Sequence, residues 1–218
     1  MRRLAGALLL FLLVSCVKTP PAVVRAPVPD DLSVLRLAGE WSIPPLGRFP
    51  PVIGLRFGGI SGLAALEGGT ELLGISDDRD GSRMYRFGVS GEGASFRVVP
   101  TDSIPLQWAP SGPPAADSEA IAILRSGNVL VASEGIGSLE PRVPPALIEY
   151  GQQGQFVRQL EVRDRFSPNP TGPPSRGVRA NMGFESLTIA PGGRRLYTAT
   201  ETALVQDGEP ASFDTGAQ

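Results

Sequence analysis

The sequence predicts an all-β protein, a β-propeller built from four-stranded antiparallel blades. The main observation is a motif that occurs three times: a short apolar strand, a turn with glycine, a second apolar strand and then an acidic residue. A second observation is the high content of turn-forming residues, with 27 glycines and 22 prolines in 218 residues. Repeats of this kind indicate an array of similar β units, and stacking the units brings their equivalent residues together.

The first 16 residues have the features of a bacterial lipoprotein signal peptide. Arg2 and Arg3 precede an apolar run, Leu4 to Val14, which is shorter than the roughly 20 residues needed to cross a bilayer. The segment Leu-Val-Ser-Cys16 resembles a lipobox, and Cys16 is the single cysteine of the sequence. An ordinary secretory peptide, with an incidental cysteine, is the alternative. The position after the cysteine is occupied by Val17, whereas an aspartate there would favour retention in the inner membrane. We therefore expect an outer-membrane lipoprotein that faces the periplasm.

Residues 17–31 are expected to form a tether, because proline fixes φ, removes backbone donors and keeps a chain extended. Residues 32–218 are then the partial propeller domain. Within it, Leu32 to Leu37 would be an outer strand that pairs with the final blade of a complete ring. The hydrophobic share of 41% is normal for a chain with a buried core.

The charge and the histidine content exclude several function classes. A net charge of −2 provides no basic surface, which argues against a nucleic-acid partner. The sequence contains no histidine, so the usual general base of a Ser-His-Asp triad and the commonest transition-metal ligand are missing. Acid–base chemistry would fall to carboxylates, and we expect a metal to be a hard cation with oxygen ligands, such as Ca²⁺.

Each repeat begins with a hairpin. The first strands are runs of small and apolar residues, of which 119–124 is the clearest. The turns contain residues that tolerate positive φ or preset a turn, and they are expected at 68–69, 126–128 and 191–193. The return strands are apolar along most of their length, as in strands buried on both faces between neighbouring sheets. They are expected at 72–76, 129–133 and 196–200.

Two further strands follow each of the first two hairpins, and four antiparallel strands per unit are typical of a propeller blade. They are expected at 84–89 and 95–99, and at 146–150 and 156–162. Few residues follow the third hairpin, so the sequence contains about two and a half blades. Because propellers close with about four blades or more, we expect a longer gene product. An open β-solenoid, or an oligomer that completes the ring, is the alternative.

Acidic residues occupy equivalent positions of the repeats. Glu119 and Glu185 begin the first strands of their hairpins, and the first repeat has Ser61 near that position. Three more acids close the return strands: Asp77, Glu134 and Glu201. A hairpin places the start of one strand beside the end of its partner, so these acids should crowd at one end, where a cation or raised pKa values would relieve their repulsion. Solvated turn acids, or acids paired with arginines, are the alternative.

The sequence also resembles a known family. Six segments carry the resemblance: Phe57-Gly-Gly-Ile-Ser-Gly-Leu, Ile75-Ser-Asp-Asp-Arg-Asp-Gly, Asp117-Ser-Glu-Ala-Ile, Ala132-Ser-Glu-Gly, Asn181-Met-Gly-Phe-Glu-Ser-Leu-Thr and Ala199-Thr-Glu-Thr-Ala-Leu. In combination they resemble the phytase-like family, which has the esterase-like activity of phytase. The resemblance extends over most of the expected mature chain. It implies a β-propeller and a calcium-assisted phosphoester hydrolase.

The acids can be given roles in such a hydrolase. Calcium takes six to eight oxygen ligands, and its expected ligands are Asp77, Asp78, Glu134 and Glu201. A bound ion would leave a carboxylate to act as general base, for which Glu119 and Glu185 are the catalytic candidates. Arginine binds phosphate bidentately, so Arg179 and its neighbour Asn181 are expected to contact a small phosphoester substrate.

Two other functions remain open at this point. Propeller lactonases also use a calcium-bound carboxylate site, so the substrate could be a lactone or a carboxylic ester. The acids could instead hold a structural ion in a non-catalytic envelope propeller that binds a ligand or a partner. A propeller fold alone does not distinguish these functions, because propellers support many of them.

Overall fold

The computed structural model describes residues 39–42, 57–79, 81–107 and 117–213. The chain separates into two units, Met1–Leu37 and Ala38–Gln218, and all described residues belong to the second. The expected signal peptide with Cys16, the tether and the strand expected at 32–37 lie outside the described residues. Within the described ranges, the structure has no helix of the length and apolar character needed to cross a membrane.

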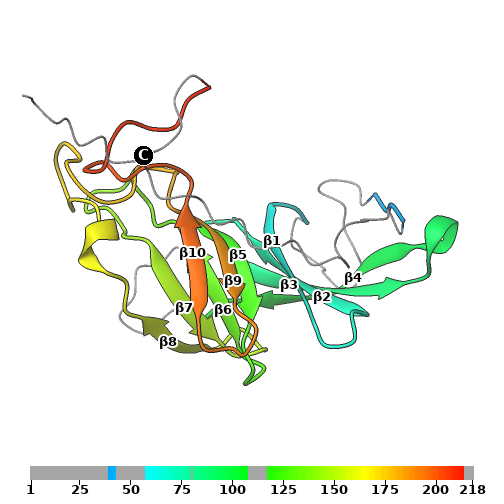
Figure 1. Ribbon diagram of the computed structural model, residues 1–218. Coiled ribbons are helices and arrows are strands. Elements are labelled where there is room, and N and C mark those ends of the chain that lie inside the picture. Colours follow the sequence, from blue (N-terminus) through cyan, green and yellow to red (C-terminus); the bar gives the residue numbers. More distant parts are fainter. Residues whose placement is uncertain (1–38, 43–56, 80, 108–116, 214–218) are drawn as a thin grey trace, which may run out of the picture. The chain divides into compact units, whose positions relative to one another are not determined.

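The described residues form three antiparallel sheets and almost no helix (Figure 1). The first sheet has the order β1-β2-β3-β4, with strands Ile60–Ala65, Glu71–Ser76, Arg83–Ser90 and Arg97–Pro105. The second has the order β5-β6-β7-β8, with strands Ser118–Ile123, Val129–Ser133, Ala146–Tyr150 and Phe156–Leu160. The third pairs β9 (Phe184–Ile189) with β10 (Leu196–Thr200). The all-β prediction is confirmed, and the order of each four-stranded sheet is that expected of a blade.

The strand predictions differ from the structure at two outer strands. The strand expected at 95–99 begins at Arg97 and continues to Pro105, because the preceding residues form a 3₁₀ turn, Gly93–Ser95. Ser95 stabilises that turn: its Oγ donates to the carbonyl oxygen of Glu92 at 2.8 Å and accepts the Glu92 N–H at 3.1 Å. The strand expected at 156–162 ends at Leu160.

The second sheet is covered on both faces. One core cluster joins it to the first sheet, through side chains such as Leu73 and Ile75 of β2 and Val129 and Val131 of β6. Another cluster packs Phe184 of the third sheet on the alanines of β5 and β6. All five residues of β6 are therefore buried, as the apolar return strand predicts.

The expectation of burial on both faces is wrong for the return strand β10. Three of its five residues are exposed, including Leu196 and Tyr197. The physical reason is that β9 is the single strand paired with β10 among the described residues, and the neighbouring core cluster reaches only the other strand of this hairpin, through Phe184 and Leu187.

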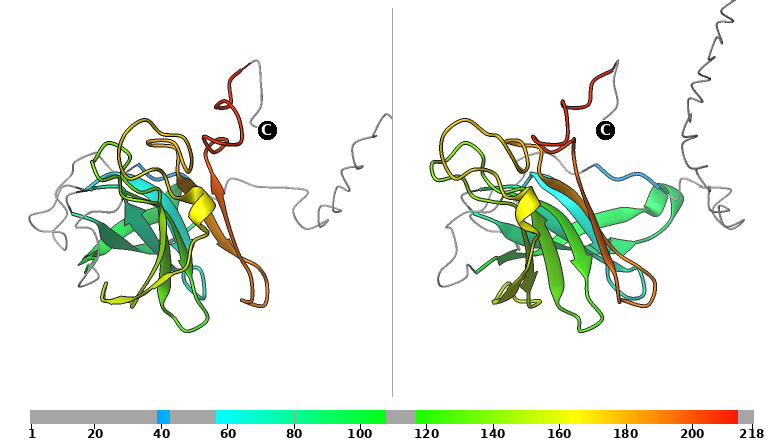
Figure 2. Two further views of the ribbon diagram at one scale, coloured as in Figure 1. Left: turned by 90° about the vertical axis from the view of Figure 1, so that its left-hand side faces the viewer. Right: turned by 60° about the vertical axis from the view of Figure 1, so that its left-hand side comes forward.

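The three hairpins repeat in their hydrogen bonds as well as in their sequence. Each has a bulge near the start of its first strand, where the strand register shifts: at Ser61, Glu119 and Glu185. The same backbone hydrogen bond closes each hairpin. The residue after the return strand donates its N–H to a carbonyl oxygen two residues before the bulge. The donor and acceptor pairs are Asp77 and Gly59, Glu134 and Asp117, and Glu201 and Gly183. The turns of the hairpins lie together at the opposite end (Figure 2). This geometry collects the predicted acids at one end of the sheets.

The first two hairpins pack closely at Gly62 of β1. A Cβ atom at this position would lie 3.0 Å from the Cα of Ala120 and 3.1 Å from the carbonyl oxygen of Glu119. Gly88 of β3 is a matched comparison, because a Cβ there would meet only the Cγ2 of Thr101, at 3.6 Å. Glycine at Gly62 therefore permits the approach of β1 to β5.

We expect Gly62→Ala to lower the free energy of unfolding by about 1–3 kcal/mol, because the added methyl group overpacks against backbone atoms that cannot rotate away. Gly88→Ala should leave the free energy of unfolding unchanged or raise it by about 0.4–1 kcal/mol. Urea unfolding of the full chain measures both values. Equal effects of the two substitutions would show that the contact at Gly62 does not limit packing.

Candidate functional site

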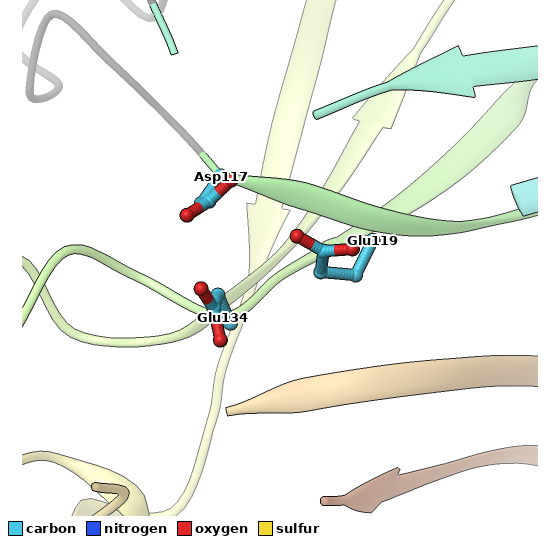
Figure 3. Close-up of side chains that lie close together, drawn as sticks. All are labelled: Asp117, Glu119 and Glu134. Atoms are coloured by element: carbon cyan, nitrogen blue, oxygen red, sulfur yellow. The ribbon is translucent and has the colours of Figure 1, made fainter. Parts of the chain in front are cut away.

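Three carboxylates converge at the end of the second hairpin (Figure 3). Asp117 precedes β5, Glu119 lies on the β5 bulge, and Glu134 follows β6. One ligand oxygen from each lies within 4.8 Å of the others. Asp117 and Glu134 are buried, and Glu119 is half-buried. We call Asp117, Glu119 and Glu134 the acidic cluster.

The bulge explains how Glu119 joins this cluster. A bulge inserts one residue opposite a regular partner strand and redirects a side chain that would otherwise follow the alternation. The Glu134 side chain is fixed in another way: its Oε2 accepts the backbone N–H of Gly183 at 3.1 Å. The glycine leaves room for this contact, because a Cβ at Gly183 would lie 2.5 Å from the Cα of Glu134.

Burial and mutual repulsion favour the protonated forms of these acids. Burial, followed by the negative charges of neighbouring acids, raises the pKa of Glu119 to about 7, although a hydrogen bond with Ser61 opposes the shift. Burial also raises the pKa of Glu134 and of Glu185. The neighbouring carboxyl groups of Asp117 and Glu185 add to the rise in the pKa of Glu134, because negative charges this close repel one another.

Arg79, in the loop after β2, supplies positive charge to the cluster. Its Nε donates to Oδ2 of Asp117 at 2.5 Å, and its Nη2 group forms an ion pair with the same oxygen. Nη2 also lies 3.7 Å from Oε1 of Glu134 and donates to Oδ1 of Asn181 at 3.0 Å. Arg79 thereby connects the loop of the first repeat to the second repeat and to the segment before the third.

The other predicted metal ligands lie around this cluster or away from it. Asp77 and Glu201 are exposed, and their charges act on Glu119 and Glu185 respectively. Asp78 instead forms an ion pair with Arg83, with 2.7 Å between Oδ2 and Nη1. The structure therefore brings Glu134 to the centre, Asp77 and Glu201 to the edge, and Asp78 to a separate pair.

Of the two predicted substrate contacts, Asn181 lies at the site and Arg179 beside it. Asn181 adopts a left-handed backbone conformation, with φ of 58°, and accepts from Arg79. Arg179 lines a cavity of about 100 Å³ together with Glu134, but its guanidinium donates to the carbonyl oxygens of Ala203 and Gly208. Arg179 thus holds the segment that follows β10.

Sequence reasoning did not assign Asp117 or Arg79 to the site, although both lie in motifs that it singled out. A signal for Asp117 was present. The two other hairpins have Gly59 and Gly183 at the equivalent position, so the hairpin itself does not require an acid there. Arg79 was visible only as a positively charged residue among three acids, Asp77, Asp78 and Asp80.

The donor set fits a hard divalent cation. All three ligands are carboxylate oxygens, the type that Ca²⁺ and Mg²⁺ prefer. Two oxygens on opposite sides of one Ca²⁺ lie about 5 Å apart, twice the ordinary Ca–O distance, and the separations in the acidic cluster stay within that limit. Burial, and after it the charges of neighbouring acids, raises the pKa values of Glu119 and Glu134, and a bound cation would favour the ionised forms of these groups. Such a cation would be held by the buried Asp117 and Glu134, with Glu119 beside it.

Comparisons with known proteins identify the family of the chain. The family model "Phytase-like: Esterase-like activity of phytase" matches residues 55–218. An "Uncharacterized secreted protein" of Arthroderma benhamiae is 24% identical over 163 residues, a match that covers 65% of this chain and 30% of the relative. The chain therefore spans less than a third of the length of that relative. No solved structure matches the chain. Because the family model covers three quarters of the sequence, including every strand and the acidic cluster, the chain belongs to the phytase-like family.

Proposed function

We propose that this protein is a calcium-assisted phosphoester hydrolase whose reaction takes place at the acidic cluster. The observation that carries the proposal is the convergence of Asp117, Glu119 and Glu134, in a chain of the phytase-like family. One carboxylate oxygen of each residue lies within 4.8 Å of the others. The family description supports hydrolysis of an ester bond. The donor chemistry supports calcium, since these ligands are all carboxylate oxygens.

The chain's own groups have separate tasks in this proposal. Asp117 and Glu134 are the buried ligands of the cation, and Asp77 and Glu201 extend the negative field around it. When bound, Ca²⁺ would polarise a phosphoryl oxygen and lower the pKa of a coordinated water. Glu119 is the candidate general base, because a carboxylate with a pKa near 7 accepts a proton more effectively than an ordinary carboxylate. Glu185 is the second candidate, through its link to Glu134.

We also propose that the sheets are blades of a β-propeller. Two sheets are four-stranded meanders, and the first, second and third sheets pack on one another through apolar faces. The first strands of the three hairpins line a common hollow of about 260 Å³, as the inner strands of blades line a channel. This arrangement supports blades of a ring.

We further propose export and a lipid anchor at Cys16, in the outer membrane of a bacterium. The apolar run before Cys16 and the lipobox-like Leu-Val-Ser-Cys16 support this location. The name of the Arthroderma benhamiae relative, a secreted protein, agrees with export.

The hydrolysis test uses the full chain with a phosphomonoester, a phosphodiester and a lactone, each with calcium added and with calcium chelated. We expect calcium-dependent release of phosphate. Glu119→Gln should lower kcat by about 100-fold or more, because it removes the group that accepts the proton; a loss of that size with Glu185→Gln alone would assign the general base to Glu185 instead. The control is Glu161→Gln, the same change at an exposed glutamate outside the site, which should retain full activity. Hydrolysis of the lactone alone would replace the phosphoester assignment with a carboxylic ester one.

Calcium affinity should depend on pH near neutrality. A cation binds the ionised carboxylates, and burial raises the pKa of the ligand Glu134 to about 8, so protons compete with the cation below that pH. We expect affinity to rise at least about tenfold between roughly pH 5.5 and roughly pH 8.5. Calorimetry in buffers of different ionisation enthalpy should show proton release on binding. A flat profile over this range would mean that the cluster is already ionised at acidic pH.

The lipid anchor is tested by Cys16→Ala in a Gram-negative host. We expect the wild-type chain in the membrane fraction and the variant in the soluble fraction or unprocessed, because the cysteine sulfur is the atom that lipidation requires. Thr19→Ala, three residues further along the chain, is the control and should remain membrane-bound. A soluble wild-type chain would favour the ordinary secretory peptide.

A further inference from the structure

The guanidinium of Arg79 already holds two of the three carboxylates in the acidic cluster. Its Nη2 group contacts Oδ2 of Asp117 and lies 3.7 Å from Oε1 of Glu134. These two residues are also the most buried members of the cluster. A positively charged side chain therefore already contacts the oxygens that suit a divalent cation.

Arg79 reaches these acids from solvent. Its side chain is 44% exposed, whereas those of Asp117 and Glu134 are 4% and 3% exposed. It extends from the loop after β2, and its contact with Asn181 is an exposed side-chain hydrogen bond. Because the Glu134 carboxylate accepts a backbone N–H and Asp117 is buried, whereas the arginine side chain is exposed, rotation of that side chain can separate the groups without moving a strand.

Charge repulsion opposes simultaneous binding. A divalent cation held by Asp117 and Glu134 would lie within a few ångströms of the guanidinium, and like charges at that distance in a partly buried site repel strongly. We propose that Arg79 and a divalent cation exclude each other from Asp117 and Glu134, and that the displaced guanidinium binds the anionic group of the substrate. The inference rests on the proposed function and adds a positioning role for Arg79.

The chemistry of arginine suits this exchange. A guanidinium presents several N–H donors in a planar fork that matches carboxylate and phosphate oxygens alike. Arg79 can therefore leave a carboxylate of the protein for a phosphate of the substrate while making the same kind of charge-assisted hydrogen bonds. It remains charged throughout, because a guanidinium stays protonated at all pH values that proteins tolerate; the hydrogen bond with Asp117 raises its pKa further while the pair is intact.

The test measures exposure of Arg79 directly. A dicarbonyl reagent modifies arginine, and mass spectrometry of the full chain after digestion locates the modified residue. We expect calcium to increase the modification of Arg79 several-fold, and added inorganic phosphate to reduce it again. Arg158 is the matched control: it pairs with the buried Glu149 at 2.7 Å, is also exposed, and contacts no residue of the acidic cluster. Its modification should not respond to calcium.

A second measurement uses Arg79→Gln and calorimetry with calcium alone. We expect this variant to bind calcium at least about tenfold more tightly than wild type, because the competing positive charge is gone. Arg79→Lys, which keeps the charge, should stay within a few-fold of wild type and serves as the control for folding. Calcium binding without a change in Arg79 modification would overturn this inference and leave the proposed function standing. No detectable binding of calcium to the wild-type chain would overturn both.

Discussion

The structure depends above all on negative charge that is held away from water. Asp117 and Glu134 are buried, and Glu119 converges on them at the end of one hairpin. Ionised carboxylates at such a site lose hydration and repel one another, so the folded chain must retain protons or provide positive charge. It does both. The pKa of Glu119 is raised to about 7, and Arg79 donates to Asp117. Each neighbouring feature can be understood as a response to this charge.

The backbone explains why these charges meet. A bulge near the start of each hairpin places Glu119 and Glu185 beside the ends of their return strands, where the closing hydrogen bonds of the repeats lie. The first repeat has Ser61 at this position and contributes no glutamate. It provides Arg79 instead, from the loop after its return strand. The site is thus asymmetric: the second repeat supplies all three acids of the acidic cluster, the third repeat adds the half-buried Glu185, and the first repeat supplies the positively charged side chain. A regular repeat accounts for the position of the site, and departures from the repeat account for its chemistry.

The hairpins, their turns and the equivalent acids are predictable from the sequence, because each depends on a local pattern of apolar, glycine and acidic residues. Contacts between repeats are not. Arg79 meets Asp117 and Asn181 at separations of 38 and 102 residues, and no local pattern records such a pairing. The prediction for Asp78 missed a local ion pair with Arg83, and that for Arg179 missed its backbone acceptors. Residue type and position identified these two side chains, but the structure uses them to fasten loops.

Three kinds of positive charge can neutralise the same carboxylates: protons, the guanidinium of Arg79 and a divalent cation. Species that share one site are linked, so each weakens the binding of the others. In the proposed exchange, an anionic substrate would act in the opposite direction, because it would bind the guanidinium of Arg79 that the cation displaces. The sequence has no histidine, the side chain whose ordinary pKa lies nearest neutrality, so another group must titrate in that range. Crowding and burial give Glu119 a pKa in that range. The burial of charge that disfavours folding therefore also creates the acid–base group that the composition lacks.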